Sequence, residues 1–558
     1  MIRVPRSFLR ATLALGVGLL AACDDGGTGD DELDIPASVA AAATGPSSVT
    51  VTFGAVDDAA GYIVQRATGA AATDFATVGT PAGTTFNDDE LAPSTTYRYR
   101  VAAVAGNDTS AFSAPVNVTT QNPGSANLVG DITASRTLHS DTVYTLTQYI
   151  HVTNGATLTI EAGTRILGVP SSGLFILRGA KIRAMGTADA PVVFTSSQPA
   201  GQRQPGDWGG LVIVGRGVVN RANPVILEGT GFASANNYEV TYTTPAGETA
   251  SNADDSGELH YVRIEFAGFG PTANNELNSL TLAAVGSGTE IDHVQSNSGL
   301  DDSFEWFGGA VDAKYLVSYN SGDDHFDASE GYVGRNQFMI ALQDTILAPR
   351  QGQGTLATDP QGIENDGCSG QNCLNGFNSQ PYTMPIFANF TLVGLRGTGV
   401  TVPASGGRGM VLRRGTGGYY VNGVVTRWNA SAIAIRDQAT ADRIAAGDLA
   451  LRNILAADNG GTFETGAGTF TVDAAANAIE TSAATAASLF ASLPATPTTA
   501  TLDWTPSAGS AARTGGLTTF PANIAAKAGT FVTGTAYRGA ADPNGPKWWE
   551  GWTIYAVN

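Results

Sequence analysis

The sequence predicts an all-β protein in which a small β-sandwich precedes a large parallel β-helix. Glycine occupies 69 of its 558 positions and only 14% of residues are charged, a composition typical of short strands joined by many turns. Alternating Val, Thr and aromatic residues indicate half-buried strands along much of the chain. Between residues 299 and 331, a pattern of acidic and aromatic residues repeats after 22 positions, as expected for one coil of a β-helix.

The balance of charges excludes one class of partner. The formal net charge is −20. Nucleic acids are bound through positive patches, so an acidic chain of this kind is not expected to bind them. Apolar residues make up 42% of the sequence, a content that excludes a disordered chain.

The first 22 residues predict a cleaved export signal. Arg3, Arg6 and Arg10 form a positive region, and the apolar residues 11–22 are too few to span a bilayer. The segment ends in Leu-Ala-Ala-Cys, which resembles the bacterial lipobox and implies cleavage before Cys23 and lipidation of its thiol. We therefore expect an exported protein, anchored by lipid in the bacterial cell envelope. The outer membrane is the expected membrane, and the side that the domains face is left open.

Residues 36–121 predict a β-sandwich, joined to Cys23 by a flexible acidic tether that ends at residue 35. A strand of alternating Val and Thr runs up to Phe53. The stretch LAPSTTYRYRVAAV, residues 91–104, is similar to the fibronectin type III signature, in which Tyr97 would form the tyrosine corner. The resemblance implies a spacer or a weak binding module, with Phe53 in place of the usual core tryptophan.

Residues 125–558 predict the β-helix. Short apolar strands alternate there with turns rich in Gly, Asn and Asp. The acidic pair at residues 301–302 recurs 22 positions later at residues 323–324, and Phe304 recurs as Phe326. Stacked coils bury a common core that no single coil can bury alone. A long antiparallel sandwich is the alternative, and a repeat that stays in phase disfavours it.

The same region resembles the right-handed parallel β-helix proteins of the pectin-lyase-like class. More narrowly, it is similar to a group of exported bacterial lipoproteins with GDWGG, LDDSFEWFGG and QGIE motifs, found here at residues 206–210, 300–309 and 361–364. The resemblance implies a fold and a location outside the cytoplasm. It implies no reaction, because that group has no established activity.

Residues 345–385 interrupt the repeat and are expected to leave the coil as a lateral loop. They contain Cys368 and Cys373, the remaining cysteines of the chain after Cys23. In an exported protein such a pair is expected to form a disulfide, with two free thiols as the alternative.

Two further departures from the repeat lie near the C-terminus. Residues 460–515 are rich in Ala and Thr, and a helix is expected to start at Asp473. The last segment concentrates Trp548, Trp549 and Trp552, and is expected to cap the open last coil.

The acidic rows of adjacent coils predict a cation site. Like charges brought close together raise one pKa or require a cation, and calcium takes about six to eight oxygen ligands of the kind that clustered carboxylates supply. Glu305 and Asp327 repeat the pattern three residues after the Asp pairs. The expected metal ligands are Asp301, Asp302, Asp323, Asp324, Asp327, Glu364 and Asp366. No nucleotide, haem or zinc is expected, because the motifs that bind them are missing from the sequence.

A polysaccharide-cleaving site is a second hypothesis for the same rows. Two carboxylates can divide acid and base roles in glycoside hydrolysis, and the 22-residue spacing resembles that of the polygalacturonases. The candidate catalytic residues are Asp302, Asp323 and Asp324. Trp306 and Tyr319 would stack on a sugar, and Arg335 would pair with a uronate. The histidine motif of those enzymes is missing here, which weighs against the hypothesis.

A structural role is the third hypothesis. Asp and Asn at repeated corners often accept hydrogen bonds from the backbone of turns. Phe304 and Phe326 would then form a ladder in the core, beneath solvated acidic corners.

These observations predict an envelope-anchored surface lipoprotein that binds a glycan or another cell-surface ligand, with calcium stabilising the acidic rows. A polysaccharide lyase or glycoside hydrolase of pectin-lyase-like fold is one alternative, and a structural stalk or adhesin is another. Whether the protein is an enzyme is left open, and a binding role is favoured.

Overall fold

The computed structural model describes residues 33–555, apart from residues 90, 223, 233–235, 273–274, 358–359, 369, 371, 400, 402–405 and 466–471. The predicted export signal, Cys23 and the first part of the tether lie outside the described residues. The chain is divided into two compact units. The first holds residues 49–88 and 96–118 with the segment before residue 43, and the second holds nearly all the rest. Within the described part of the chain, no helix is long and apolar enough to cross a membrane.

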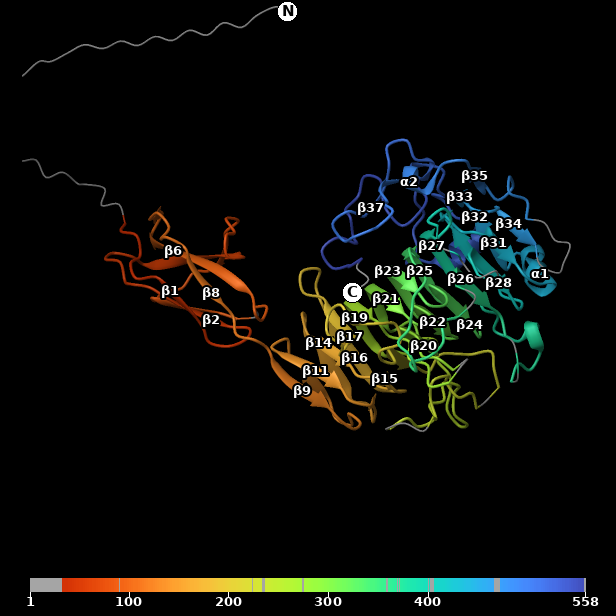
Figure 1. The fold of residues 1–558 in the computed structure, drawn as a ribbon, viewed down its shortest axis with the longest axis horizontal. Helices are drawn as coiled ribbons and strands as arrows, with labels where there is room; N and C mark the ends of the chain where they lie inside the picture. Colours follow the sequence, from red (N-terminus) through yellow and green to blue (C-terminus); the bar gives the residue numbers. More distant parts are fainter. Residues whose placement is uncertain are drawn as a thin grey trace, which may run out of the picture. The chain divides into compact units, whose positions relative to one another are not determined.

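The first unit is a β-sandwich (Figure 1). One sheet has the strand order β1-β2-β5, and the other has β4-β3-β6-β7 with β8 beside β6. Phe53 and Tyr97 are buried, and the Phe53 ring meets the Tyr62 ring edge to face at 4.7 Å. Phe53 therefore fills the core as predicted. The strands are β1 (Ala40–Ala43), β2 (Val49–Thr52), β3 (Gly61–Thr68), β4 (Ala76–Gly79), β5 (Thr85–Asp88), β6 (Thr96–Ala105), β7 (Asp108–Thr109) and β8 (Val116–Thr119).

The second unit is a parallel β-helix, and the predicted fold class is confirmed. Its described strands form a seventeen-stranded sheet and a ten-stranded sheet. The larger sheet contains β9 (Gly124–Leu128), β10 (Arg136–Leu138), β11 (Thr142–Leu146), β13 (Thr157–Ile160), β14 (Arg165–Gly168), β16 (Lys181–Met185), β17 (Val192–Ser196), β19 (Gly257–Glu265), β21 (Glu290–Gly299), β23 (Asp312–Ser321), β25 (Arg335–Leu342), β27 (Ile386–Val393), β29 (Gly418–Val421), β30 (Val424–Thr426), β32 (Leu449–Arg452), β33 (Leu455–Ala457) and β35 (Glu480–Ser482). The smaller sheet contains β12 (Tyr149–Val152), β15 (Gly173–Ile176), β18 (Leu211–Val214), β20 (Leu280–Ala283), β22 (Phe304–Phe307), β24 (Phe326–Ser329), β26 (Gln361–Asp366), β28 (Arg408–Arg413), β31 (Ser431–Ile435) and β34 (Phe463–Thr465).

The 22-residue repeat is the register between the strands β22 and β24 of the smaller sheet. Phe304 of β22 lies opposite Phe326 of β24, and their stacked rings are 5.4 Å apart. Alternation along β22 places Phe304 and Trp306 in the core and Glu305 on the outer face. The long strands of the larger sheet bend where His293, Tyr315 and Phe338 have φ values of 51°, 59° and 64°. Because each of these long strands bends, it forms two faces of its coil, and the strand of the smaller sheet forms the third. Each such coil therefore has three faces, although it contains only two continuous strands.

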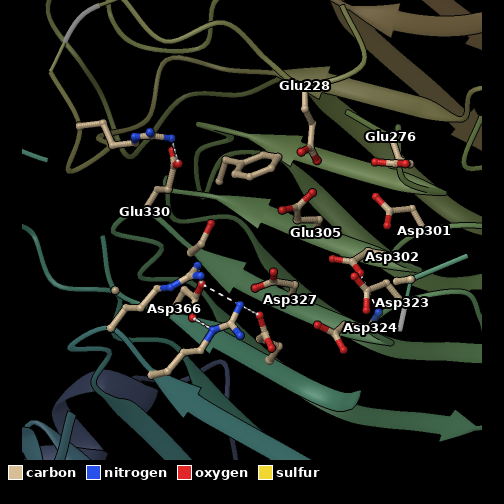
Figure 2. A pocket seen from close by; sticks show the side chains of 18 of the residues that line it. Glu228, Glu276, Asp301, Asp302, Glu305, Asp323, Asp324, Asp327, Glu330 and Asp366 are labelled. Carbon is tan, nitrogen blue, oxygen red and sulfur yellow. Dashed lines mark hydrogen bonds and ion pairs between the residues drawn. The ribbon is translucent and has the colours of Figure 1, made fainter. Parts of the chain in front are cut away.

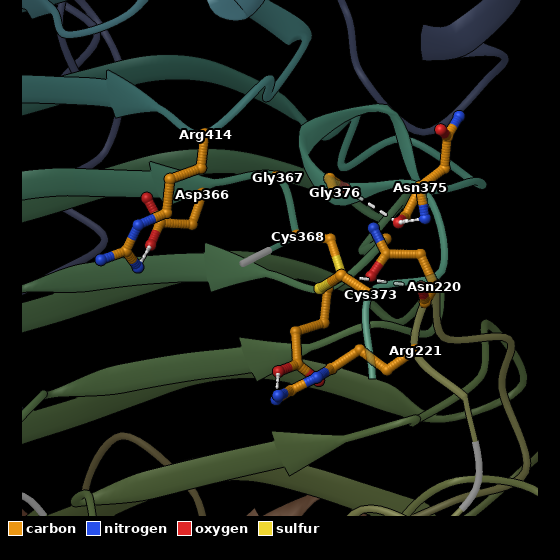
Figure 3. Close-up of a disulfide and its surroundings, with 12 residues drawn as sticks. Asn220, Arg221, Asp366, Gly367, Cys368, Cys373, Asn375, Gly376 and Arg414 are labelled. Carbon is orange, nitrogen blue, oxygen red and sulfur yellow. Dashed lines mark hydrogen bonds and ion pairs between the residues drawn. A yellow bond between two sulfur atoms is a disulfide. The ribbon is translucent and has the colours of Figure 1, made fainter. Parts of the chain in front are cut away.

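The predicted lateral loop at residues 345–385 is wrong in part. Its residues 361–366 form β26, which pairs with β24 and β28 in the sheet. The excursion after β26 contains the 3-10 helix η1 (Gly376–Asn378). The predicted disulfide is confirmed, with Cys368 and Cys373 joined and their Cα atoms 5.9 Å apart (Figure 3).

Residues 473–478 form turns before β35, so the predicted helix at Asp473 is wrong. The remaining elements are α1 (Gln438–Ala446), α2 (Ala486–Leu489), β36 (Phe490–Ser492), β37 (Asp503–Pro506), η2 (Ala511–Arg513) and α3 (Ala522–Ala528).

The C-terminal segment does not cap the last coil as predicted. It runs along the outer face of the larger sheet, where Trp549 and Trp552 join a buried cluster with Val317 and Ile340. The side-chain amide of Gln295 on β21 donates to the Ile554 carbonyl at 2.7 Å. The segment covers outward apolar side chains of the long strands, which would otherwise face water.

Candidate functional site

An acidic pocket of about 570 Å³ lies on the outer side of the smaller sheet, over β22, β24, β26 and β28 (Figure 2). Eleven carboxylates and three arginines line it, which gives a formal charge of −8. The carboxylates are Glu228, Glu276, Asp301, Asp302, Glu305, Asp323, Asp324, Asp327, Glu330, Glu364 and Asp366. This concentration of like charge requires protons or cations to offset it.

The strands supply one row of these groups. Glu305, Asp327 and Glu364 lie opposite one another on β22, β24 and β26. Their neighbours along each strand point into the core, so the three carboxylates project from the same face. Parallel strands are about 4.8 Å apart, which sets the spacing of the row.

The turns before the strands supply a second row, fixed by side-chain-to-backbone hydrogen bonds from coil to coil. The backbone N–H of Asp302 donates to Asn278 Oδ1 at 3.1 Å, and that of Asp324 donates to Asp302 Oδ1 at 2.7 Å. The N–H of Gln361 donates to Asp324 Oδ1 at 2.6 Å, and that of Arg408 donates to Gln361 Oε1 at 3.1 Å. These contacts support the structural hypothesis for the acidic corners. They use one oxygen of each aspartate in the row.

Three acidic triads overlap within the pocket. In each triad, one oxygen from every residue lies within 4.8 Å of the others. The triads are Asp301–Asp302–Asp323, Asp302–Glu305–Asp327 and Asp324–Asp327–Glu364. Asp302 and Asp327 each belong to two triads, so the triads form one continuous array of oxygen donors.

The arginines gather at one end of this array. Arg413 pairs with Glu364 and with Asp366, where Nε lies 2.7 Å from Oδ1, and Arg414 also pairs with Asp366. Arg221 pairs with Glu330. At the other end, where Asp301, Asp302, Asp323 and Asp324 gather in Figure 2, the described lining contains no basic side chain.

Burial is the main cause of the shifted pKa values here, and repulsion between carboxylates adds to it. Burial raises the pKa of Glu228 to about 7. The pKa is also raised, well above the usual range, for Asp301, Asp302, Glu305, Asp324, Asp327 and Glu364. Without a bound cation, burial and repulsion therefore favour the protonated form of these carboxylates.

Residues 130–506, more than half of the chain, match the family described as pectate-lyase-like β-helix domain. The chain belongs to this family. Two of the motifs singled out in the sequence of this pectate-lyase-like β-helix domain build the pocket, since residues 300–309 and 361–364 carry Asp301, Asp302, Glu305 and Glu364. A search of curated proteins finds no match.

The third motif, GDWGG, brings two coils together beside the pocket. Gly210 has a φ of 130°, and a Cβ atom there would lie 2.0 Å from the carbonyl oxygen of Asn278. Only glycine allows this approach. Trp208 is fully buried and donates from Nε1 to the Glu265 carbonyl at 2.8 Å.

Three solved structures resemble a smaller part of the chain. They are domains A168–A170 of titin at 24% identity, the FN5 domain of Drosophila Lar at 22%, and an Fn3-like protein from Clostridium thermocellum at 26%. They match 16%, 16% and 15% of this chain, and 33%, 98% and 86% of their own lengths, with TM-scores of 0.16, 0.15 and 0.14. The chain thus spans a third of the titin structure.

The donors in the pocket fit a hard divalent cation, which binds oxygen ligands. Asp327 Oδ1 is buried and has no hydrogen-bond partner among the described residues. Asp327 also belongs to two of the triads. The acidic clusters of this β-helix can therefore hold a metal ion.

All the residues predicted as metal ligands or as catalytic residues line this one pocket. The predicted ligand-binding residues do not. Trp306 and Tyr319 are fully buried, with Trp306 stacked on Tyr332 in the core and Tyr319 packed against Tyr555. Neither ring can stack on a sugar, so that prediction is wrong. Arg335 does not line the pocket and pairs instead with Asp312.

Sequence reasoning missed Glu228, Glu276, Glu330 and the three arginines of the pocket. Glu228 and Arg221 come from the excursion between β18 and β19, and Arg413 and Arg414 stand where β28 ends. The chain returns to the sheet after excursions of unequal length, so the sequence offers no constant spacing for these residues. Only the position of Arg413 opposite Asp366 reveals the pairing.

Proposed function

We propose that the acidic pocket binds calcium and that the calcium-loaded β-helix binds a glycan at the cell envelope. The observation that carries the proposal is the convergence of three overlapping carboxylate triads in one pocket. Calcium takes about six to eight oxygen ligands in flexible geometry, and such an array supplies them.

The end of the pocket without arginine is the proposed cation end. Asp301, Asp302, Asp323, Glu305 and Asp327 would hold the ion there, because Glu364 and Asp366 already pair with Arg413. Bound calcium would neutralise the carboxylates and offer coordination positions to oxygen atoms of a ligand. A pocket of about 570 Å³ has the size of a small-molecule site, which supports the entry of a sugar unit.

The decisive variant is Asp302→Asn combined with Asp327→Asn. An asparagine at position 302 keeps the oxygen that accepts the Asp324 N–H, just as Asn278 accepts one coil earlier, so the turn ladder is preserved. Calcium titrated into wild-type protein stripped with EDTA should release or absorb saturable heat and raise the melting temperature. Both the heat of binding and the increase in melting temperature should be at least tenfold smaller in the double variant.

Asp189→Asn is the matched control, because Asp189 is exposed and outside the pocket. It should bind calcium like the wild type. Equal calcium binding by the double variant and the wild type would refute the proposed site. Glycan binding is then measured with a panel of polysaccharides, in the presence of calcium and in EDTA. Binding that does not depend on calcium would refute the proposal that the calcium-loaded form binds the glycan.

A polysaccharide lyase or glycoside hydrolase is the second candidate. The specific observation in its favour is that Asp302, Asp323 and Asp324 share the pocket, while burial raises the pKa of Asp302 and Asp324 so that they can hold protons. New reducing ends or unsaturated uronates from the same panel, lost in Asp302→Asn/Asp324→Asn, would establish an enzyme. The absence of any product would leave binding as the function.

We also propose that Cys23 carries the lipid that anchors the protein in the outer membrane, with the membrane as its first partner. The support is the sequence alone, with its short apolar run ending at Cys23. In cells, Cys23→Ser should move the protein from the membrane fraction to the soluble fraction. Retention in the membrane would refute the anchor.

A further inference from the structure

A second pocket, of about 510 Å³, lies apart from the acidic one. Its walls are the loop after β17, which includes residues 201–205, and the loop after β25, which includes residues 345–350. Residues 355–357 of the latter loop line the acidic pocket, so this one loop borders both sites.

The charge of the second pocket is opposite to that of the first. Among the described residues, its lining includes Arg203 and Arg350 and no carboxylate. Behind the wall, Asp207 lies 2.8 Å from Arg350 Nε, and Glu265 lies 3.9 Å from Arg203 Nη1. Both carboxylates are almost fully buried.

Two further guanidinium groups add positive charge near this pocket. Arg263 Nε donates to Glu265 at 3.1 Å, and Arg165 is close enough to interact electrostatically with Glu265, Arg203 and Arg263. Among the described residues, these four arginines, of which Arg203 and Arg350 line the pocket, thus outnumber the two buried carboxylates behind it, in a protein whose net charge is −20. Arg350 uses Nε and Nη2 to bind Asp207 and the Gln202 carbonyl, and its Nη1 makes no hydrogen bond to any described residue. That group can donate to a ligand.

The rest of the lining combines polar and apolar groups. Gln202, Gln204 and Thr345 offer amides and a hydroxyl, whereas Phe266 and Leu347 are apolar. Guanidinium groups match the planar geometry of a carboxylate, and amides match hydroxyl groups.

We propose that this second pocket binds a small hydroxycarboxylate, whose carboxylate pairs with Arg203 and Arg350 and whose hydroxyl groups meet Gln202 and Gln204. This inference goes beyond the proposed function, since it concerns a different site and requires no metal.

The test is a calorimetric titration of the full chain with gluconate, at low ionic strength and in EDTA. Arg203→Gln removes one guanidinium while Arg263 still pairs with Glu265. Ala348→Trp fills the pocket from an exposed position without changing a charge. Arg183→Gln is the control, because Arg183 is exposed, pairs with Glu258 and lies outside the pocket.

Gluconate should bind saturably to the wild type and to Arg183→Gln, and at least tenfold more weakly to each pocket variant. If Arg203→Gln does not fold, Ala348→Trp decides. No saturable binding, or wild-type affinity in the folded pocket variants, would overturn the proposal. Equal binding of sorbitol or sulfate would overturn the hydroxycarboxylate assignment. Because EDTA removes calcium, failure here is distinct from failure of the acidic site.

Discussion

Asp302 and Asp324 each take part both in the hydrogen bonds that fix the turns and in the acidic triads. One oxygen accepts a backbone N–H from the next coil, at 2.7 Å and 2.6 Å, and so holds the turn in place. Both residues also belong to cation-binding triads. The structural and the cation hypotheses therefore apply to the same side chains. Substitution by asparagine separates them, because an amide keeps the acceptor and removes the charge.

Glu228 makes stability depend on pH. Burial raises its pKa to about 7, so between pH 4.5 and 7 the folded state binds a proton that the unfolded state has lost. Without divalent cations, the free energy of unfolding should therefore fall as pH rises through this range, by about 3 kcal/mol from this group. Urea denaturation in EDTA at several pH values measures the fall.

Glu228→Gln should make this dependence less steep without abolishing it, because the other buried carboxylates of the pocket also bind protons in the folded state. Calcium should reduce the dependence in the wild type by replacing the lost protons. Glu239→Gln, on an exposed glutamate of the same excursion, should leave it unchanged. A wild-type protein whose stability rises between pH 4.5 and 7 in EDTA would contradict the prediction.

At the scale of elements, the acidic row depends on the aromatic stack beneath it. Phe326 alternates with Asp327 on β24, and its ring stacks on Phe304 in the core. A slip of one residue in register would turn the carboxylates inward and the rings outward. Core packing therefore fixes which side chains reach the pocket.

Phe326→Ala should lower the free energy of unfolding by about 3 to 5 kcal/mol, because it leaves a cavity in the fully buried stack. Phe338→Ala is a matched comparison, since Phe338 stacks on Tyr315 but is only partly buried. Its cost should be clearly smaller. Chemical denaturation of both variants measures the two losses in the free energy of unfolding. Equal losses would show that the stack of Phe304 and Phe326 in the core does not contribute more to stability than the partly buried stack of Tyr315 and Phe338.

At the scale of the whole molecule, the C-terminal segment completes the β-helix from outside. Its aromatic side chains cover Val317, Ile340, Val393, Val424 and Leu455, which project from the outer face of the larger sheet. Without this cover, a continuous apolar strip would meet water.

Deletion of residues 484–555 should therefore give a protein that aggregates and binds an apolar dye such as ANS. Deletion of residues 33–121 is the control, because the first unit has its own core and its loss should leave the β-helix soluble. A soluble C-terminal deletion that unfolds cooperatively and binds no dye would contradict the assigned role.

The repeat of the acidic pair after 22 residues was enough to predict the β-helix and to bring Asp301, Asp302, Asp323 and Asp324 together. It was visible because only short turns separate β22, β23 and β24. The same pattern could not show that Trp306 and Tyr319 are buried. Assigning them to a sugar site required knowing what covers each face, and the C-terminal segment that covers Tyr319 lies more than 200 residues later in the chain.

The sequence by itself determined the fold class, the disulfide and the core of the acidic site, because these depend on local spacing. Tertiary structure alone decided the rest. Asp327 and Glu364 lie opposite each other although 37 positions separate them, and Asp366 lies opposite Arg413 across 47 positions. Because the excursions between coils differ in length, the spacing of equivalent residues is not constant in the sequence. The hydrogen bonds of the sheet nevertheless place these residues opposite one another in the structure. The arginine end of the pocket, its additional glutamates and the second, basic pocket therefore became visible only when the coils were stacked.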